Sequence, residues 1–236
     1  MSGMNTKLQI HPVQANILVV LLFKSKAKFS QLNVLKIPND HFTFHLKRLI
    51  KSSLAKKTKD GRYQLTKKGK EFANRFDTEN IEIERQAKVG ILVVCVKKEK
   101  RRYKYLIQQR LKEPYYGFYG FVTGKVRWGD TVEDTARREL EEETGLSGTL
   151  KFLGIKHKID YDKKGQLLED KFFFVFKATN LKGKLIKEYE GGKNIWLTEK
   201  EAMKLPDLFD AVDESISMIK KRTIQFSEKK FRVRGY

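Results

Sequence analysis

The chain has 236 residues, a formal net charge of +21 and 40% hydrophobic residues. This length allows two globular domains or one large one. The longest apolar run, "NILVVLLF" at residues 16–23, is shorter than the roughly 18 residues of a membrane span and lacks the flanks of a signal peptide. Cys95 is the one cysteine and stands in the apolar run "ILVVCV", so we expect it to be buried in a cytoplasmic protein.

Positive charge is concentrated in the first third of the chain. Residues 1–75 contain 16 Lys and Arg against 3 Asp and Glu, whereas residues 76–236 contain 34 against 26. A basic field of this kind attracts anionic partners and supplies sequence-independent contacts to phosphates. The composition therefore favours a polyanion as partner of the first third, although it also fits a solvated basic surface.

The first 76 residues predict three helices, a hairpin and a fourth helix. Pro12 suits a first helical turn before the apolar residues 17–23, Ser30 can cap a short helix over 31–37, and Asp40 can cap a third over 41–54. Asp60-Gly61 is a two-residue hairpin signal between two strand-like runs. Residues 67–76, "KKGKEFANRF", close the unit as a helix.

This order, with "FTFHLKRLIKSSLAKKTKDGRYQLTKKGKEFA" at its centre, resembles a winged helix-turn-helix domain. The resemblance implies that a homodimer binds duplex DNA, with the third helix in the major groove and the hairpin on the backbone or minor groove. The alternative is a solvated surface on a domain that mediates dimerisation. The resemblance implies these contact residues: Thr43, His45, Lys47 and Arg48 on the helix, and Lys56, Lys57, Lys59 and Arg62 on the hairpin.

Residues 77–86, "DTENIEIERQ", contain neither Gly nor Pro. We interpret them as a helical linker that continues from the first domain. Such a linker predicts that the two domains are coupled in orientation.

An acidic cluster lies in "GKVRWGDTVEDTARRELEEETGL", residues 124–146. We expect a helix that begins near Thr131 or Val132 and ends at Gly145, among strands at 88–96, 103–111, 149–161, 171–178 and 193–198. Glu139, Glu142 and Glu143 then share one helix face, where like charges repel. A hard divalent cation such as Mg²⁺ reverses that repulsion.

The same segment resembles the Nudix box, G-x5-E-x7-R-E-U-x-E-E-x-G-U with U an aliphatic residue. Every fixed position from Gly124 through Arg138-Glu139 to Gly145-Leu146 agrees except Asp130, where the family has Glu. The resemblance implies an α/β/α sandwich with a mixed sheet over residues 87–222, so that the whole chain has an α+β fold. It also implies hydrolysis of a nucleoside diphosphate linked to another group.

By this resemblance Glu139, Glu142, Glu143 and the carbonyl of Gly124 are expected metal ligands, for Mg²⁺ or Mn²⁺. Catalytic roles are assigned to Glu142, Glu143 and the box arginine Arg138. Arg110 and Tyr119 are the candidate substrate contacts, beside Tyr115, Tyr116 and Phe118. Core packing explains the three tyrosines and Phe118 equally well. The general base stays open among Glu169, Asp170, Glu188 and Glu190.

Residues 223–236 form a basic C-terminal tail that could be disordered, packed on the domain, a dimer arm or a nucleic-acid contact. The leading hypothesis is a Mg²⁺-dependent hydrolase that carries a DNA-binding domain. The alternatives are a transcription regulator that senses a nucleotide with weak or no hydrolysis, and an RNA-processing enzyme.

Overall fold

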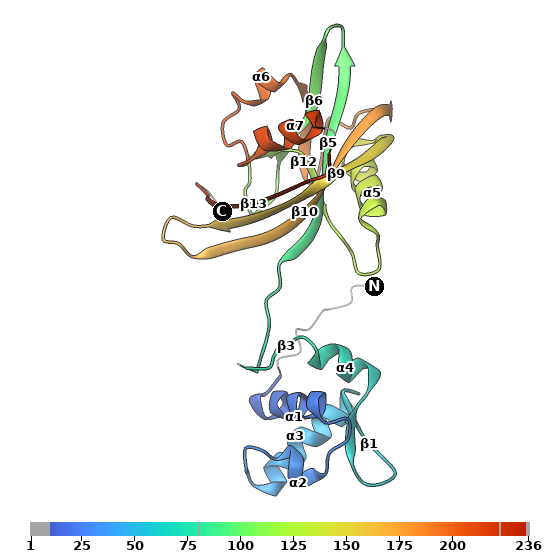
Figure 1. The fold of residues 1–236 in the computed structure, drawn as a ribbon, viewed down its shortest axis with the longest axis vertical. Coiled ribbons are helices and arrows are strands. Elements are labelled where there is room, and N and C mark those ends of the chain that lie inside the picture. The colour runs from blue at the N-terminus through green and yellow to red at the C-terminus, as the bar shows by residue number, and fades with distance from the viewer. Residues whose placement is uncertain (1–9, 80, 222, 235–236) are drawn as a thin grey trace. The chain divides into compact units, whose positions relative to one another are not determined.

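The computed structural model describes residues 10–79, 81–221 and 223–234 and divides into two units between Arg85 and Gln86. The first unit contains helices α1 (Pro12–Phe23), α2 (Phe29–Leu32) and α3 (Asn39–Lys51), strands β1 (Ala55–Lys57) and β2 (Tyr63–Leu65), and helix α4 (Lys67–Ala73) (Figure 1). This succession confirms the predicted order of helices and hairpin. The second and third helices begin two residues earlier than predicted, at residues 29 and 39.

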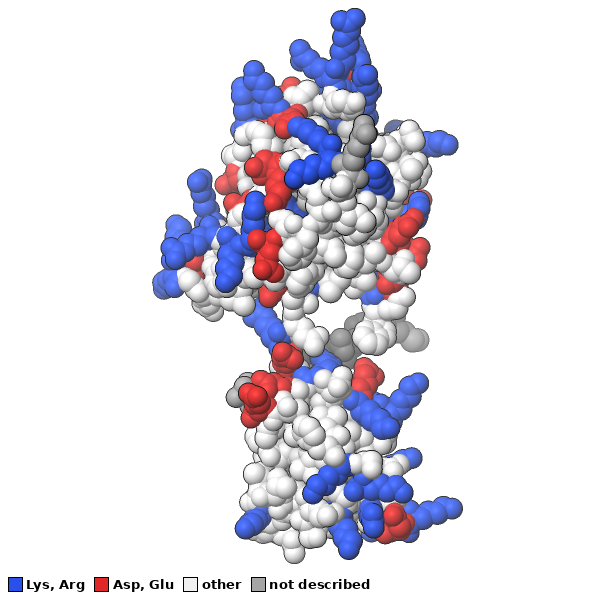
Figure 2. Space-filling model, in the orientation of Figure 1, with Lys and Arg blue, Asp and Glu red and all other residues white. Residues whose placement is uncertain are grey.

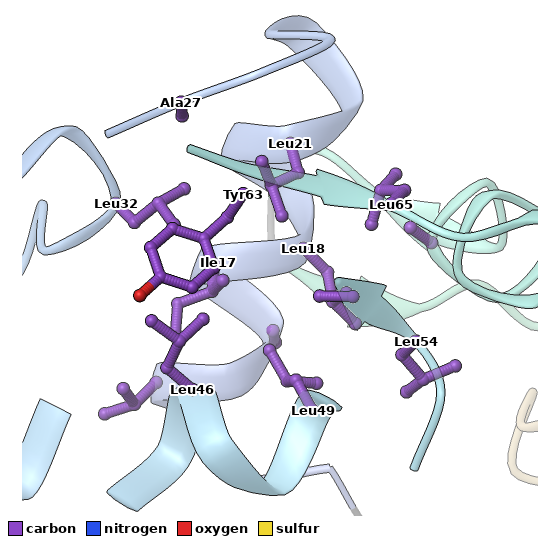
Figure 3. Packing of buried hydrophobic residues seen from close by; sticks show 14 of the residues in the cluster. Ile17, Leu18, Leu21, Ala27, Leu32, Leu46, Leu49, Leu54, Tyr63 and Leu65 are labelled. Carbon is purple, nitrogen blue, oxygen red and sulfur yellow. The ribbon is translucent and has the colours of Figure 1, made fainter. Parts of the chain in front are cut away.

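The core of the first unit is built on α1, which is apolar on most of its surface. Ile17 and Leu18 of α1 are fully buried and pack with Leu49 of α3 and Leu65 of β2 (Figure 3). Helix α4 lies close to the start of β1, because a Cβ atom on Gly69 would fall 1.7 Å from the carbonyl oxygen of Leu54. Burial of these side chains therefore fixes both the helices and the hairpin.

The prediction of a helical linker at residues 77–86 is wrong. Strand β3 (Phe76–Asp77) pairs with β4 (Glu82–Ile83), and residues 84–87 are neither helix nor strand. Phe76 is buried in the core of the first unit, and the Glu84 N–H donates to the Arg75 carbonyl over 3.0 Å. Burial of an apolar side chain and strand pairing outweigh the helix propensity of the segment, whose residue 80 lies outside the described residues.

The second unit is organised around a nine-stranded mixed sheet, with strand order β11-β12-β6-β5-β10-β9-β13 and with β7 on β6 and β8 on β5. β10 is parallel to β5 and β13 is parallel to β9, whereas the other pairs are antiparallel. The bounds are β5 (Lys88–Glu99), β6 (Arg102–Arg110), β7 (Tyr119–Gly120), β8 (Val122–Lys125), β9 (Leu146–Tyr161), β10 (Leu167–Gly183), β11 (Glu188–Tyr189), β12 (Gly192–Leu197) and β13 (Gln225–Arg232).

Helices cover both faces of this sheet (Figure 1). Val93 and Cys95 of β5 pack on the side of α5 (Val132–Thr144), whereas Val94 and Val96 pack on the side of α7 (Val212–Lys220). The short α6 (Glu199–Ala202) lies on the α7 side through Ala202. Alternate residues of one central strand thus enter two cores, which confirms the predicted sandwich.

The predicted tail is largely a strand. β13 pairs with β9 from Gln225 to Arg232, and it forms the edge of the large sheet. Val233 follows it, is buried, and donates its N–H to the Tyr161 carbonyl over 2.9 Å. Among the described residues, none of the helices is both long and apolar enough to span a bilayer.

Candidate active site

The acidic cluster lies on α5, as predicted. Thr131 caps the helix by accepting the Asp134 N–H over 3.1 Å, and Gly145 ends it in the left-handed conformation with φ of 70°. Glycine adopts this conformation without the steric cost that a Cβ atom imposes. The helix is amphipathic, with Ala136 and Leu140 buried against the sheet.

A cavity of about 720 Å³ opens beside α5. Glu139 and Glu143 line it from the helix, Gly124 lines it from the end of β8, and Gln108 lines it from β6. Basic side chains of the surrounding loops and strands also line it: Arg110, Lys112, Lys125 and Arg127. The box therefore places carboxylates and cations around one space that is large enough for a nucleotide.

Gly124 and Glu139 are in close contact. A Cβ atom on Gly124 would lie 2.1 Å from the Glu139 Cγ atom, closer than two carbon atoms can approach without a displacement. The glycine of the box therefore makes room for a box glutamate, and this contact holds the Glu139 side chain between β8 and the cavity.

Glu143 is the buried glutamate of the box, with 8% of its surface exposed. Burial raises its pKa, and nearby Glu139 adds to the rise, whereas hydrogen bonds with Gln108 and Tyr189 lower it. Gln108 Nε2 donates to Glu143 Oε2 over 3.1 Å. Asn194 Nδ2 donates to the Glu143 carbonyl over 2.8 Å, so that β12 fixes the last turn of α5.

Arg138 binds the remaining box carboxylates. Its Nη1 donates to Glu139 Oε1 over 2.7 Å and to Glu142 Oε2 over 3.2 Å. Its buried Nη2 lies 3.8 Å from Asp130 Oδ2 and has no hydrogen-bond partner among the described residues. Asp130 is one methylene shorter than the glutamate of the box pattern, and it lies 3.8 Å from this nitrogen.

The donor set fits a hard cation only in part. Within the described residues, no group of three or more His, Cys, Asp or Glu side chains is placed to hold a metal ion. Glu142 is mostly exposed and paired with Arg138, whereas Glu139 and Glu143 line the cavity. Two carboxylates nevertheless suit Mg²⁺, which is commonly held by one or two carboxylates together with waters and substrate phosphates.

The two predicted substrate contacts differ in position. Arg110 lines the cavity, but its guanidinium donates to the carbonyls of Lys112, Glu113 and Pro114, so it also braces that loop. Tyr119 is partly buried and packs against the core on the α7 side, which is the alternative interpretation of this residue. Of the four candidate bases, only Glu169 is among the residues that line the cavity.

Apart from Glu169, sequence reasoning missed the wall of the cavity formed by β9 and β10. Glu169 receives Lys88 Nζ at 2.6 Å and Lys171 Nζ at 3.5 Å. On β9, Asp160 binds Lys158 and accepts the Tyr115 hydroxyl over 3.1 Å. Polar residues at every second position of "KHKID" were the available signal, because they share one face of a strand.

The predicted DNA contacts fall into two groups. Lys47, Arg48 and the basic residues of the β1–β2 hairpin are exposed, whereas Thr43 is partly buried. His45 differs from the expectation, since only 3% of it is exposed and its Nε2 lies 3.2 Å from the His41 Nε2. The His45 ring lies against the rings of His41 and His11, so we exclude His45 from the proposed DNA contacts. The exposed hairpin cations are Lys56, Lys57, Lys59 and Arg62.

Comparison with known proteins places this site in a family. Residues 85–218 match the NUDIX domain. A segment of 66 residues is 36% identical to an ADP-ribose pyrophosphatase of Methanocaldococcus jannaschii, and it covers 28% of this chain and 39% of that relative. The chain thus matches about two-fifths of the relative's length.

Two solved structures share the fold. The NUDIX domain of Shewanella oneidensis NrtR, complexed with ADP ribose, is 17% identical with a TM-score of 0.51, over 64% of this chain and 95% of that one. A MutT protein of Bacillus halodurans is 22% identical with a TM-score of 0.50, over 61% of this chain and 90% of that one. The family match covers more than half of the chain and contains the box and its cavity, so the chain belongs to the Nudix family.

Proposed function

We propose that this protein hydrolyses a phosphoanhydride bond in a nucleoside diphosphate linked to another group, with the help of a divalent metal ion. The observation that carries the proposal is that Gly124, Glu139 and Glu143 line one cavity together with several cations. A diphosphate resists nucleophilic attack because of its negative charge. Cations around the cavity oppose that repulsion and orient the phosphates.

Each residue of the site has a defined role in this proposal. Glu139 and Glu143 hold the metal ion, which when bound neutralises phosphate charge and lowers the pKa of a water molecule. Arg138 orients Glu139 and keeps Glu142 near the cavity. Gln108 and Tyr189 fix the Glu143 carboxylate by hydrogen bonds, so that it does not have to reorganise during the reaction. Lys112, Lys125 and Arg127 are the phosphate contacts that we favour.

ADP-ribose is the first substrate to test. The archaeal relative is named an ADP-ribose pyrophosphatase, and the Shewanella domain was solved with ADP ribose. A cavity of about 720 Å³ has the volume of known ligand sites. A panel of nucleoside diphosphate sugars, dinucleotides and nucleoside triphosphates with Mg²⁺ or Mn²⁺ then defines the specificity.

Substitution of the cavity acids tests the metal site. We expect Glu143→Gln and Glu139→Gln to lower turnover of the best substrate by at least about tenfold, because each removes a charge that binds the metal. Glu141→Gln is the matched control: it lies on the same helix but is exposed and does not line the cavity. Equal turnover in all three variants would contradict the assignment.

A second candidate function is nucleotide sensing with little hydrolysis. It is favoured by the position of Glu142, which is exposed and held by Arg138 rather than lining the cavity. If Glu142 joins the metal site when substrate binds, Glu142→Gln lowers turnover by at least about tenfold. Binding of ADP-ribose by calorimetry without turnover of any compound in the panel would select the sensor instead.

We also propose that the first unit binds duplex DNA as part of a homodimer. The support is the exposed charge of Lys47 and Arg48 on α3 and of the β1–β2 hairpin. In the full chain, Lys47→Ser/Arg48→Ser should weaken duplex binding and reduce its salt dependence, because each phosphate contact releases counterions. An unchanged affinity and salt dependence in this variant would reject these two contacts.

A further inference from the structure

The end of the β5–β6 hairpin projects beyond the strands that flank it. Pairing of β10 with β5 stops at Cys95 and pairing of β12 with β6 stops at Tyr105, whereas β5 and β6 pair with each other as far as Glu99 and Arg102 (Figure 1). We call residues 97–104, "KKEKRRYK", the hairpin tip. The tip contains six Lys and Arg and one Glu, and Figure 2 shows cationic side chains gathered at this end of the second unit.

Most of this charge is not neutralised within the protein. Glu99 accepts Lys104 at 2.8 Å and Lys97 at 3.8 Å, and Lys97 also lies 4.6 Å from the centre of the Trp196 ring. The four other cations of the tip are exposed and have no ion pair with any residue that the structure describes. They are Lys98, Lys100, Arg101 and Arg102. Four like charges on one short hairpin repel each other unless an anionic partner lies against them.

The turn of the hairpin tip contains a lysine in an unfavourable backbone conformation. Lys100 and Arg101 form the two-residue loop between Glu99 and Arg102, and Lys100 has φ of 53°. Glycine and asparagine are preferred at this position, since a side chain in the left-handed region costs on the order of 1 kcal/mol. A glycine would thus be easier to accommodate, but it would remove the charge at the end of the tip.

The tip also carries an aromatic ring beside a hollow. Tyr103 is 58% exposed and is paired across the strands with Lys98. A surface hollow of about 380 Å³ is lined by Arg102, Tyr103 and Lys200, and its acid, Glu199, is paired with Lys220 at 2.9 Å. An exposed aromatic ring is a surface on which an unpaired base can stack, and the free cations beside it can bind the phosphates of the same strand.

We propose that the hairpin tip binds single-stranded nucleic acid. Charge complementarity argues for a polyanion, and the exposed Tyr103 argues for unpaired bases rather than a duplex, whose bases are already stacked. A membrane-binding tip would expose several apolar side chains, and among the tip residues the one large hydrophobic side chain exposed is Tyr103. The proposal concerns the second unit alone and is independent of both the hydrolysis and the duplex binding proposed above.

The test is fluorescence anisotropy of the full chain with labelled 12-mers of oligo-U RNA and oligo-dT DNA in EDTA, across a range of salt concentrations. We expect Arg101→Ser/Arg102→Ser to weaken binding at least about tenfold and to flatten the salt dependence by about 1.4 in log-log slope, for two phosphate contacts. Tyr103→Leu should weaken binding about fivefold or more through lost stacking. A difference between the RNA and DNA arms identifies the natural ligand.

Lys100→Gly separates binding from folding. This variant relieves the left-handed turn, so its melting temperature should be equal or higher, while its affinity for the 12-mers falls at least about threefold. Lys163→Ser/Lys164→Ser is the matched control, because it removes two exposed charges from the turn between β9 and β10. It should change the affinity by less than about twofold.

Three results would overturn the proposal. One is wild-type affinity in all tip variants, and another is an equal loss in the control variant. The third, measured in the same way with a labelled 12-mer DNA duplex and with vesicles of anionic lipid, is a loss confined to either of these two ligands. Hydrolysis of the best substrate by the tip variants should stay within about twofold of wild type, so a failure of the binding proposal is distinguishable from a failure of the hydrolase proposal.

Discussion

Asp130 is one methylene group shorter than the glutamate that the box pattern specifies, and one nitrogen of Arg138 lacks a hydrogen bond to the described part of the chain. The buried Nη2 of Arg138 has no hydrogen-bond partner among the described residues, and Asp130 lies 3.8 Å from it. An unsatisfied buried donor destabilises the folded state. We therefore expect a longer acid at position 130 to be more stabilising than Asp130.

Asp130→Glu should raise the free energy of unfolding of the second unit by about 0.5–1 kcal/mol, because the longer side chain can reach Nη2. Urea unfolding measures this change. Asp130→Asn is the control, since it keeps the short reach and removes the charge, and it should lower the stability. A stability of Asp130→Glu below that of wild type would mean that the loop before α5 has no room for the longer side chain.

At the scale of elements, the packing of α4 on β1 depends on one glycine. A Cβ atom on Gly69 would overlap the Leu54 carbonyl oxygen at 1.7 Å, and Leu54 belongs to the core of the first unit. Thr66 fixes the same junction, because its N–H donates to the Leu54 carbonyl over 3.1 Å. Helix and hairpin therefore cannot shift apart without losing this hydrogen bond.

Gly69→Ala should destabilise the first unit by roughly 2 kcal/mol or more, although alanine is the better helix former, because backbone atoms must move to relieve the overlap. Thermal unfolding with a probe in the first unit measures it. Gly61→Ala is a useful comparison, since Gly61 has φ of 79° but no atom within 4 Å of its Cβ position. A stabilised Gly69→Ala variant would contradict this close approach of α4 to β1.

His157 joins the edge strand β13 to the sheet. Its Nδ1 lies 2.6 Å from Glu228 of β13, its Nε2 lies 2.8 Å from Asp170 of β10, and its ring stacks on Phe172. Burial lowers the pKa of His157, but the hydrogen bonds and charges of Glu228 and Asp170 outweigh it and raise the pKa above 6.5. The protonated ring therefore stabilises the attachment of β13.

Because the folded-state pKa is raised, this stabilisation is complete below about pH 6.5 and is lost as the pH rises through the raised pKa. We expect the difference in melting temperature between wild type and His157→Gln to be largest near about pH 6 and to shrink by about pH 9. Thermal unfolding of both proteins at several pH values tests it. A difference that is constant with pH would show that His157 acts through packing on Phe172 alone.

For the whole molecule, the question is whether nucleotide in the second unit affects DNA binding by the first. A helical linker would couple the two units by transmitting a rotation from one to the other. Residues 84–87 form no helix, so the structure offers no such mechanical route through this segment. Linkage requires that any coupling act equally in both directions.

We therefore expect the dissociation constant of nucleotide to change by less than about twofold when duplex DNA is saturating. Calorimetric titration of ADP-ribose into Glu143→Gln, with and without DNA, measures it while suppressing turnover. The reverse titration is the control, because linkage demands the same factor. A ratio above about fivefold would show that the units are coupled by another route.

The sequence alone determined the features that depend on residues close together in the chain. The box predicted α5 from its cap Thr131 to Gly145, since capping and helix spacing are local properties. Hydrophobic periodicity predicted the main strands, and the fold class followed from the resemblance to the Nudix family. The order of elements in the first unit followed from Pro12, the Asp60-Gly61 turn and the spacing of apolar residues in α3.

Only the tertiary structure decided which side chains meet. Glu169 and Lys158 line the cavity because β9 and β10 pair in one register, whereas Tyr119 packs against the core. Strand pairing over long sequence distances also turned residues 225–232 into an edge strand, and burial of Phe76 turned residues 76–83 into a hairpin. Local propensity cannot encode such partners, because the free energy that selects them comes from burial and hydrogen bonds between distant segments.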